Sequence, residues 1–470
     1  MSASASSPAA SLAFSCWSLG HLEESLGFIE GVNKLGRMPK GEVHGFTAYR
    51  QFTAGLRVLA AAPRVDAAWT KEVNASLDGV AGRELQRLVD VPTRRAFGAF
   101  FTGSTLAERL LVGQNFGKDA FIYDPTVGAA DLLLAAAKRL PLGKSLRETL
   151  KLWGQCLAGT DLQLEFIEAA RLRLALLARL RHGDGQKIPS GLASYFPYLR
   201  RADGLEQKQL MGRTTHLLMN PPYGLTPAPE GCTWAGGRIS EAALFIVRAL
   251  EQAKPGTRLL AILPDVLRSG SFQHHWRERV SDLAEISLVE RYGIFDDIAD
   301  VDVFLLNARR RIDKDNSSRY RWPGAETTGS ITIADHFDVH VGRVVPHRDK
   351  ETGPLCRYIH PRNIPVWEEV SSVSEKRRHP LAYQPPFVVL RRTSRPGHPY
   401  RAAATVILGK SPVAVENHLI VCLPRDKSPN TCRDLMAQLR TQRVNDFLDQ
   451  RICCRHLTVG AVKEIPFTAP

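Results

Sequence analysis

The sequence predicts an α/β protein built around a mainly parallel sheet, and three observations carry this prediction. From about residue 121 onward, short apolar runs alternate with amphipathic helical segments, which is typical of βαβ units. Three successive apolar runs each end in a polar cluster, and parallel sheets bind ligands at such strand ends. Beyond about residue 333, Pro, Gly and Arg become frequent and helices few, which indicates a second, mixed α+β domain.

The expected elements follow in order along the chain. Residues up to about 91 are expected to form helices without recognisable chemistry; in the segment 78–91, apolar side chains recur at helical spacing. The alternating region predicts strands at 121–123, 156–158, 216–219, 258–263, 285–289 and 301–306, and helices at 132–140, 162–180 and 242–253. In the last third, a helix is expected over 432–447.

Length and charge suggest two or three domains and a polyanionic partner. The chain has 470 residues, 44% of them hydrophobic, and a formal net charge of +14. Residues 341–470 hold 21 Lys and Arg against 11 Asp and Glu, a balance of +10. Because nucleic acid is the commonest partner of a basic region on an otherwise balanced protein, nucleic-acid binding is expected there.

The cysteines and the hydropathy pattern predict neither a metal site nor a membrane segment. None of the eight cysteines forms a Cys-x-x-Cys pair, and Cys453 and Cys454 have no partner pair at zinc spacing. No run reaches the roughly 18 apolar residues needed to span a bilayer. Residues 1–12 carry no Lys or Arg and resemble a flexible tail rather than a signal peptide. We therefore expect reduced cysteines in a cytoplasmic protein.

The strongest chemical signal is Asn220-Pro221-Pro222-Tyr223, directly after the apolar run 216–219. Two consecutive prolines lack N–H donors and stiffen the turn, which leaves carbonyls free to accept hydrogen bonds. The Asn220 carboxamide oxygen and the Pro221 carbonyl would thus form a pair of acceptors suited to an NH2 group. Tyr223 offers a flat ring on which a base can stack.

This turn resembles the catalytic signature of the amino-methyltransferases, (Asn/Asp/Ser)-Pro-Pro-(Tyr/Phe/Trp), and matches it at all four positions. The resemblance implies a Rossmann-like S-adenosylmethionine-dependent methyltransferase sheet. It also implies that Asn220, Pro221, Pro222 and Tyr223 are the catalytic residues, with Asn220 also close to the cofactor. No metal is needed for this chemistry.

Further motifs of the same family precede the turn. Asp124-Pro125-Thr-Val-Gly128 resembles the loop that holds the methionine part of S-adenosylmethionine, although Ala130 stands where a second glycine is usual, so its methyl group would narrow the approach. Residues 95–103 resemble the N-terminal motif that closes over the cofactor, from which Thr102 is carried over as a hydroxyl contact. Gly103 there replaces the usual proline.

Two acids complete the expected cofactor site. Asp161 ends the second strand, where an acidic residue can accept both ribose hydroxyls. Asp203, in Ala-Asp-Gly-Leu, resembles the residue that accepts from the adenine amino group; the alternative for Asp203 is an ordinary surface turn.

The order of the motifs, with the basic region last, resembles the gamma class, which contains adenine-N6 enzymes with C-terminal target recognition domains. It implies a tail and helical region at 1–90, a methyltransferase domain at 91–325 and a recognition domain at 326–470. Double-stranded DNA is then the expected partner. Four arginines of that last region are the expected contacts to phosphates or guanine edges, namely Arg391, Arg392, Arg395 and Arg401.

The resemblance further implies that the target adenine is flipped out of the duplex. Several alternatives stay open: methylation of a protein glutamine, of cytosine N4 or of RNA by the same turn, or a catalytically inactive DNA-binding specificity subunit. No nuclease signature is present in the sequence. If the protein serves a restriction–modification or phage-defence system, a separate subunit would have to cleave DNA.

Overall fold

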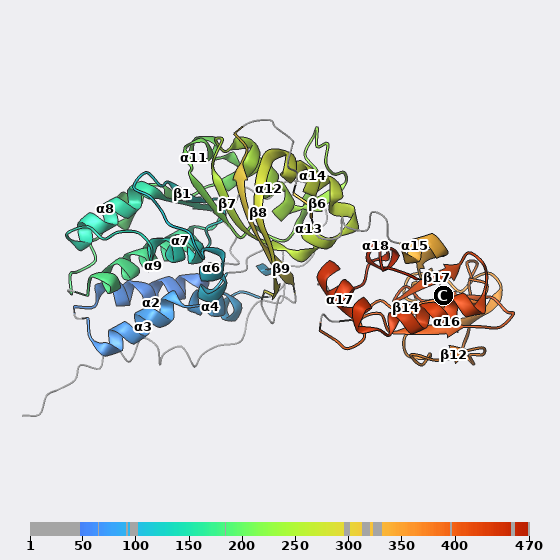
Figure 1. Ribbon diagram of the computed structural model, residues 1–470. Coiled ribbons are helices and arrows are strands. Elements are labelled where there is room, and N and C mark those ends of the chain that lie inside the picture. The colour runs from blue at the N-terminus through green and yellow to red at the C-terminus, as the bar shows by residue number, and fades with distance from the viewer. Residues whose placement is uncertain are drawn as a thin grey trace, which may run out of the picture. The chain divides into compact units, whose positions relative to one another are not determined.

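The computed structural model describes residues 48–63, 65–90, 93–94, 102–183, 185–295, 301–312, 320–322, 331–394, 397–452 and 456–468. The chain divides into two compact units (Figure 1). The first comprises residues 1–263, 278–290 and 304–319, and the second comprises 264–277, 291–303 and 320–470. Two short segments of the predicted methyltransferase domain, 264–277 and 291–303, thus belong to the second unit.

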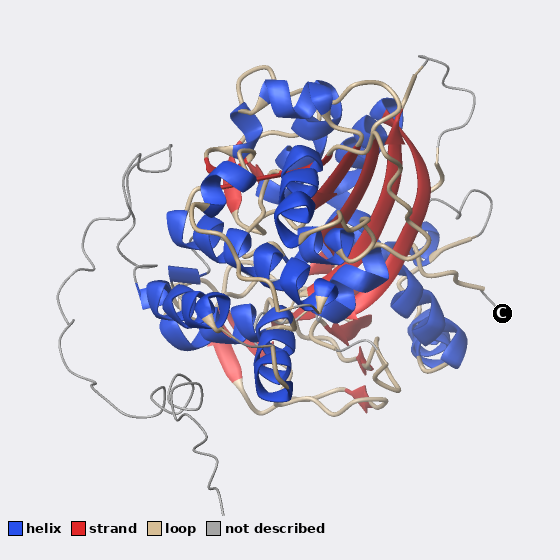
Figure 2. Cartoon of the chain, turned by 90° about the vertical axis from the view of Figure 1, so that its left-hand side faces the viewer, coloured by secondary structure: helices blue, strands red, loops and turns tan. Residues whose placement is uncertain are grey.

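A seven-stranded sheet forms the centre of the first unit, in the order β3-β2-β1-β4-β7-β9-β8. The neighbours from β3 to β7 pair in parallel, which confirms the α/β fold class expected from the alternating pattern. Figure 2 shows this twisted sheet with helices beside it. The strands are β1 Ile122–Asp124, β2 Leu157–Asp161, β3 Leu199–Arg201, β4 His216–Met219, β7 Arg258–Pro264, β8 Ala284–Ile294 and β9 Asp302–Arg310.

The strand order places a switch point between β1 and β4. From β1 the sheet runs outward through β2 and β3, and the chain then returns to add β4 on the other side of β1. In parallel sheets of this kind, the carboxyl ends of the two strands at the switch point bound a crevice that holds ligands. Asp124 ends β1 and Asn220 follows β4, so two predicted site residues lie at this edge.

Helix α9, Leu164–His182, is buried over most of its length, including Arg173 at its centre and Arg179 in its last turn. It packs against the sheet and also against the N-terminal helices, which explains its apolar character around the axis. The other helices that begin in the first unit are α2 Arg50–Ala61, α3 Ala67–Leu77, α4 Val80–Leu88, α6 Ser104–Leu110, α7 Asp131–Ala137, α8 Leu146–Cys156, α10 Leu192–Tyr195, α11 Lys208–Arg213 and α12 Glu241–Gln252.

The N-terminal helices belong to the same compact unit as the sheet. Arg50 and Arg57 of α2 form ion pairs with Glu165 and Glu168 of α9, at 3.0 and 2.6 Å. The described part of the predicted region 1–90 therefore packs on α9 and does not form a compact unit of its own.

The second unit contains two smaller sheets with separate apolar cores. One has the order β10-β17-β14-β15-β12 and the other β13-β11-β16. Their bounds are β10 Phe337–Val341, β11 Leu355–Ile359, β12 Glu369–Val370, β13 Lys376–Arg378, β14 Phe387–Arg391, β15 Ala404–Ile407, β16 Val413–Val415 and β17 Leu419–Pro424. Helices α15 Ile333–His336, α16 Pro429–Leu439, α17 Gln442–Arg451 and α18 Val459–Lys463 complete this part of the chain.

The single helix predicted over 432–447 is in fact two. Helix α16 ends at Leu439, and Thr441 starts α17 because its side chain accepts a hydrogen bond from the Val444 amide. The buried side chains Leu439 and Val444 are five residues apart, so the helical spacing of buried positions is interrupted at the same point.

Helix α13, Asp265–Ser269, ties the inserted segment 264–277 into the second unit. The buried Arg268 pairs with Asp265 at 2.6 Å and donates to the Gln450 carbonyl at 3.0 Å. Arg451 donates to the Ser269 carbonyl. Helix α14, His274–Leu283, follows and leads back toward the sheet.

Candidate active site

Asp124 lies at the end of β1, almost fully buried at 2% exposure. Its Oδ1 accepts a hydrogen bond from the Thr126 amide at 2.9 Å, which closes the first turn of the following loop. Burial raises the pKa of the Asp124 carboxyl to about 7, against the hydrogen bonds from Thr126 that lower it. A cationic ligand bound beside Asp124 would stabilise the charged form of this carboxyl and lower its pKa.

The loop after β1 is held by the neighbouring strand β2. The Val127 amide donates to the Thr160 carbonyl at 2.9 Å, and the Gly128 amide donates to Asp161 Oδ2 at 3.1 Å. Gly159 makes this possible, because a Cβ there would lie 2.7 Å from the Val127 side chain. Asp161 thus has a role that the sequence did not predict: its carboxylate fixes the position of the loop.

Asp161 also accepts from the Gln163 amide at 2.9 Å through its other oxygen. Burial raises the pKa of this carboxyl to about 6. Each carboxylate oxygen can accept a second hydrogen bond, so the two contacts to backbone amides do not exhaust its capacity.

Ala130 has a left-handed backbone conformation, with φ 73° and ψ 30°. It is the N-cap residue of α7 and is fully buried. Its methyl group is not among those that line the pocket described below. Replacing the usual glycine therefore carries backbone strain of about 1–2 kcal/mol.

The Asn-Pro-Pro-Tyr turn is bonded to its surroundings on both sides of the Asn220 carboxamide. Asn220 Nδ2 donates to Thr102 Oγ1 at 3.1 Å, and the Tyr223 hydroxyl donates to Asn220 Oδ1 at 2.8 Å. The Thr126 hydroxyl lies 3.3 Å from the Asn220 backbone carbonyl. Burial raises the pKa of the Tyr223 hydroxyl well above its ordinary value, so this group stays a donor.

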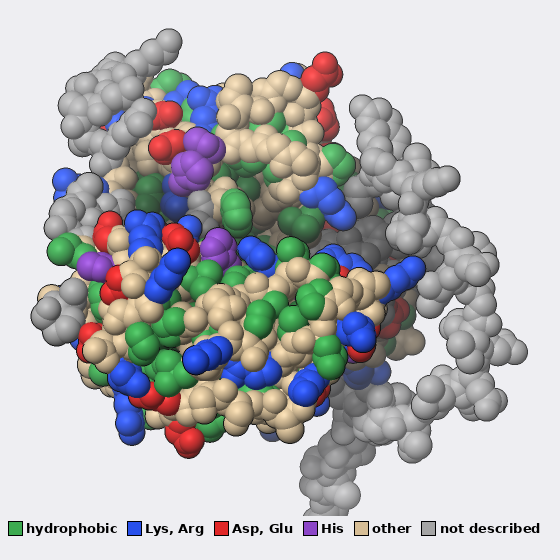
Figure 3. All heavy atoms as spheres, turned by 90° about the vertical axis from the view of Figure 1, so that its right-hand side faces the viewer, with side chains coloured by type: hydrophobic (Ala, Val, Ile, Leu, Met, Phe, Trp, Pro, Cys, Tyr) green, Lys and Arg blue, Asp and Glu red, His purple; other side chains and the backbone are tan. Residues whose placement is uncertain are grey.

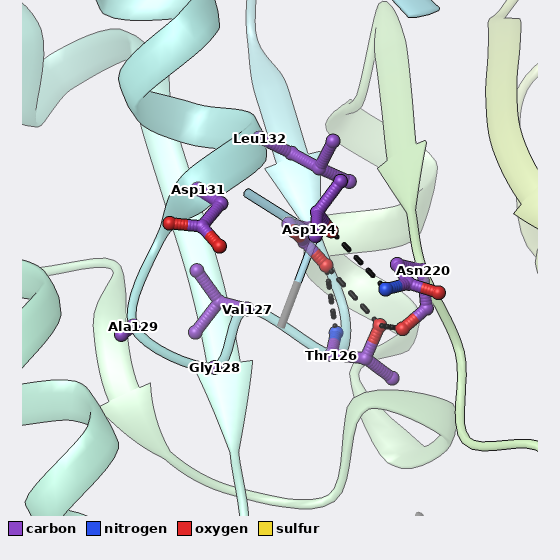
Figure 4. A pocket seen from close by; sticks show the side chains of 9 residues that line it. Asp124, Thr126, Val127, Gly128, Ala129, Asp131, Leu132 and Asn220 are labelled. Carbon is purple, nitrogen blue, oxygen red and sulfur yellow. Dashed lines mark hydrogen bonds between the residues drawn. The ribbon is translucent and has the colours of Figure 1, made fainter. Parts of the chain in front are cut away.

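An open pocket brings the loop after β1 and the Asn-Pro-Pro-Tyr turn together (Figure 4). Of the predicted residues, Thr102, Asp124, Gly128 and Asn220 line it. Figure 4 shows the Asp124 and Asn220 side chains on opposite sides of Thr126. The remaining lining residues are Thr126, Val127, Ala129, Asp131 and Leu132.

Pro125, which belongs to the loop, and Asp161 and Asp203, which lie near it, do not line the pocket. Asp203 is exposed and accepts from the Leu205 amide at 2.9 Å, capping a short 3-10 helix. The adjacent Gly204 packs on the loop, since a Cβ there would lie 2.1 Å from the Pro125 carbonyl oxygen. The Asp203 turn is thus in contact with the cofactor loop, while the carboxylate itself faces solvent.

Asp131 is a pocket residue that sequence reasoning missed. Its Oδ2 accepts from the Gly103 amide at 3.0 Å, and its Oδ1 pairs with Arg173 at 2.8 Å. Asp131 stands within the loop motif, but an acid at the first position of a helix has an ordinary explanation in the helix dipole. Only its partner on α9, distant in sequence, distinguishes it.

Of the four arginines expected to contact DNA, Arg401 has to be corrected. Its side chain is fully buried, pairs with Asp449 at 2.9 Å and donates to the Ile452 carbonyl at 3.2 Å. A guanidinium in that position holds α17 to the sheet and is not accessible to DNA. The count of arginines in the sequence could not distinguish this buried ion pair from a surface charge.

Arg391 and Arg392 are half-buried and donate to backbone carbonyls of Ile364 and Asn417, each at 3.4 Å. Arg395 lies outside the described residues, as do residues 95–101 of the N-terminal motif. The space-filling view of one face (Figure 3) shows Lys and Arg side chains spread among hydrophobic and neutral ones rather than gathered in one block.

Within the described ranges, no His, Cys, Asp and Glu side chains form a group of three or more that could share a metal ion. No helix in that part of the chain combines the length and apolar character needed to cross a bilayer.

Comparison with known proteins gives similarities of structure only. No protein-family model matches the chain, and no curated protein matches it in sequence. Among solved structures, the M protein of the type I restriction enzyme EcoKI is 17% identical over 58% of this chain and 56% of its own, with a TM-score of 0.34. A type I restriction–modification methyltransferase subunit from Streptococcus thermophilus is 16% identical over 57% and 63%, with a TM-score of 0.33.

The type IIL restriction–modification enzyme MmeI, solved in complex with DNA, gives the more extensive superposition. It is 11% identical over 81% of this chain and 70% of its own, with a TM-score of 0.54. An identity this low concerns the fold alone. Together with the strand order, the match shows a Rossmann-like α/β fold with further structure added to it.

Proposed function

We propose that the protein transfers a methyl group from S-adenosylmethionine to the N6 amino group of adenine in duplex DNA. One observation carries the proposal: Asn220, the first residue of the Asn-Pro-Pro-Tyr turn, lines the same pocket as the loop from Asp124 to Leu132. The group that would accept from an amino group therefore lies beside the loop expected to hold the methyl donor.

The chemistry of the pocket suits S-adenosylmethionine, which carries an ammonium and a sulfonium charge. Two carboxylates, Asp124 and Asp131, line the pocket and would attract these cations. Gly128, with φ 49°, allows the backbone to approach a ligand closely. Asp161 and Asp203, at the ends of the next two strands, would accept from the ribose and from the adenine amino group.

The residues of the turn would orient the target amine. The Asn220 Oδ1 and Pro221 carbonyl oxygens would each accept one N6 hydrogen and so direct the nitrogen lone pair away from the turn. Thr102 would hold the other end of the carboxamide, which keeps the Asn220 oxygen directed at the substrate. S-adenosylmethionine, when bound, supplies the electrophilic methyl group, and the transfer needs no covalent enzyme–base intermediate.

Tyr223 would have two tasks in this scheme. Its ring would stack on the flipped base. Flipping the base out of the duplex costs a few kcal/mol, and this stacking would offset part of that cost. Its hydroxyl already donates to Asn220 Oδ1. When the base enters, that oxygen would accept from both the hydroxyl and N6, because an amide oxygen has two lone pairs.

DNA recognition is assigned to the second unit, which contains the basic region 341–470. Arg391 and Arg392 remain our candidates for contacts there, and Arg395 is retained on sequence grounds alone. MmeI is described as a restriction–modification enzyme and was solved with DNA, which supports a restriction–modification or phage-defence setting. In such a setting a separate subunit would cleave the DNA.

The test is to incubate the full chain with S-adenosylmethionine and mixed-sequence duplex DNA, digest the DNA and separate the nucleosides by mass spectrometry. N6-methyladenine is the expected product, and the Asn220→Ala variant should form it far more slowly. N4-methylcytosine, or methylation of RNA or protein only, would replace the adenine assignment. DNA binding without any methyl transfer would instead identify an inactive specificity subunit.

A further inference from the structure

Arg173 lies at the centre of α9, fully buried, and its guanidinium joins three parts of the first unit. Its Nε donates to the Ser76 carbonyl at 3.0 Å and its Nη2 to the Leu77 carbonyl at 3.3 Å, both at the C-terminal end of α3. Its Nη1 donates to the Ala129 carbonyl at 2.5 Å and to Asp131 Oδ1 at 2.8 Å. One planar side chain therefore fixes both the cofactor loop and the N-terminal helices.

Asp131 extends this connection to a third segment. Its other oxygen accepts from the Gly103 amide, next to Thr102, which in turn bonds to the catalytic Asn220. Asp131 and Thr102 both line the pocket. The arginine thus acts on pocket residues through one carboxylate and one carbonyl, without lining the pocket itself.

The loop has a specific need for such an anchor. Ala130, between the two anchored residues Ala129 and Asp131, adopts the left-handed conformation that side chains other than glycine disfavour. A strained residue persists where its neighbours are fixed from outside. The contacts of Arg173 on either side of Ala130 supply that constraint.

We propose that Arg173 is a positioning residue for the cofactor loop, and that the helices before residue 90 are thereby part of the S-adenosylmethionine site. This inference rests on the proposed function for the identity of the ligand. It gives the N-terminal helices a task that their sequence did not indicate.

The chain offers a matched control two helical turns along. Arg179, on the same helix and equally buried, donates to the Ala60 and Ala62 carbonyls at 3.4 and 2.8 Å, at the end of α2. Its guanidinium also lies over the Trp69 ring of α3, 4.9 Å from the ring centroid. Loss of either arginine removes a buried tie to the N-terminal helices, whereas the bonds of Arg173 to the Ala129 carbonyl and to Asp131 tie the loop as well.

The experiment compares the full-length Arg173→Met, Arg173→Lys, Arg179→Met and Asp131→Asn variants with the wild type. Titration calorimetry at a temperature where every variant is folded measures S-adenosylmethionine binding. We expect Arg173→Met to weaken binding at least tenfold and Arg173→Lys to recover little, since one ammonium cannot reach four acceptors. Arg179→Met should stay within about twofold. Asp131→Asn keeps the size and shape of the side chain but removes its charge, so it tests the same connection if Arg173→Met fails to fold.

Hydrogen exchange of the unliganded protein supplies a second measurement that does not depend on the ligand. The amides of Gly103, Gly128 and Ala130 should exchange faster in Arg173→Met and Asp131→Asn but not in Arg179→Met. Equal weakening of ligand binding and equal exchange in the Arg173 and Arg179 variants would overturn the inference, because general destabilisation would explain both. Wild-type protein that does not bind S-adenosylmethionine would overturn the proposed function instead, even if the exchange pattern holds.

Discussion

Asn220 is held by hydrogen bonds at both ends of its carboxamide, and this determines what its removal should do. The Asn220→Ala variant loses one of two acceptors for the target amine, while the loop from Asp124 to Leu132 stays in place. We expect the rate of methyl transfer to fall by on the order of a hundredfold, as when other preorganised polar groups are removed. The affinity for S-adenosylmethionine should change little. Single-turnover assays and calorimetry measure the two quantities, and near wild-type transfer would contradict the assigned role.

The buried carboxyl of Asp124 makes cofactor binding dependent on pH. Its pKa is raised to about 7 because burial penalises the charged form, and a cationic ligand prefers that charged form. Binding should therefore weaken as pH falls, by about tenfold between pH 8 and pH 6 from this group alone. Calorimetry across this range measures the slope. Asp124→Asn should flatten it to the part that Asp161, with a pKa of about 6, contributes. A wild-type affinity independent of pH would contradict this account.

Ala130 allows a test of the strain in the loop. Ala130→Gly relieves about 1–2 kcal/mol of left-handed strain but loses a buried methyl and adds freedom to the unfolded chain. Because these effects oppose each other, the free energy of unfolding should change by less than about 1 kcal/mol. The methyl does not line the pocket, so S-adenosylmethionine affinity should stay within a few-fold. A tenfold gain in affinity would show that the methyl does obstruct the ligand.

At the scale of elements, the strands and their polar ends could be predicted, but the contacts between distant elements could not. The apolar runs after residue 121 predicted β1, β2, β4 and β7 to within a few residues, since buried parallel strands are apolar throughout. Strand β3 was not predicted, because two of its three side chains are exposed arginines and it has no apolar run. The roles of Arg173 and Arg401 were missed because their partners lie 42 and 48 residues away, and local pattern contains no information on such pairs.

Helix α17 is held to the second unit by Arg401, which gives this residue a structural role that can be measured. Arg401→Met removes the fully buried guanidinium that bonds to Asp449 and to the Ile452 carbonyl, and should lower the free energy of unfolding by about 1–3 kcal/mol. Arg425→Met, which breaks the exposed pair with Asp338, should cost less than about 1 kcal/mol. Chemical denaturation compares the two variants. If Arg401→Met were as stable as wild type yet bound DNA less tightly, the original assignment to DNA contact would be restored.

For the whole molecule, we expect the affinity for DNA and the affinity for S-adenosylmethionine to depend differently on salt concentration. The basic region 341–470 should neutralise phosphates, so log Kd for duplex DNA should rise linearly with log salt, with a slope of about 0.9 per phosphate contacted. Binding of S-adenosylmethionine should respond far less, because its charges meet buried carboxylates that salt screens poorly. Fluorescence anisotropy and calorimetry from 50 to 300 mM salt compare them. A DNA affinity independent of salt would remove the basic region from the interface.

The division of the chain into units has a consequence for the order of events during synthesis. The polypeptide passes between the two units five times. Arg268 can bond to the Gln450 carbonyl only after a further 182 residues have been synthesised. At about 5–20 residues per second, the ribosome needs roughly 10–35 s to supply that partner. During this interval the segment after β7 has no finished structure to join. The second unit therefore cannot be exchanged between genes at a single junction, because three separate stretches of coding sequence would have to move together.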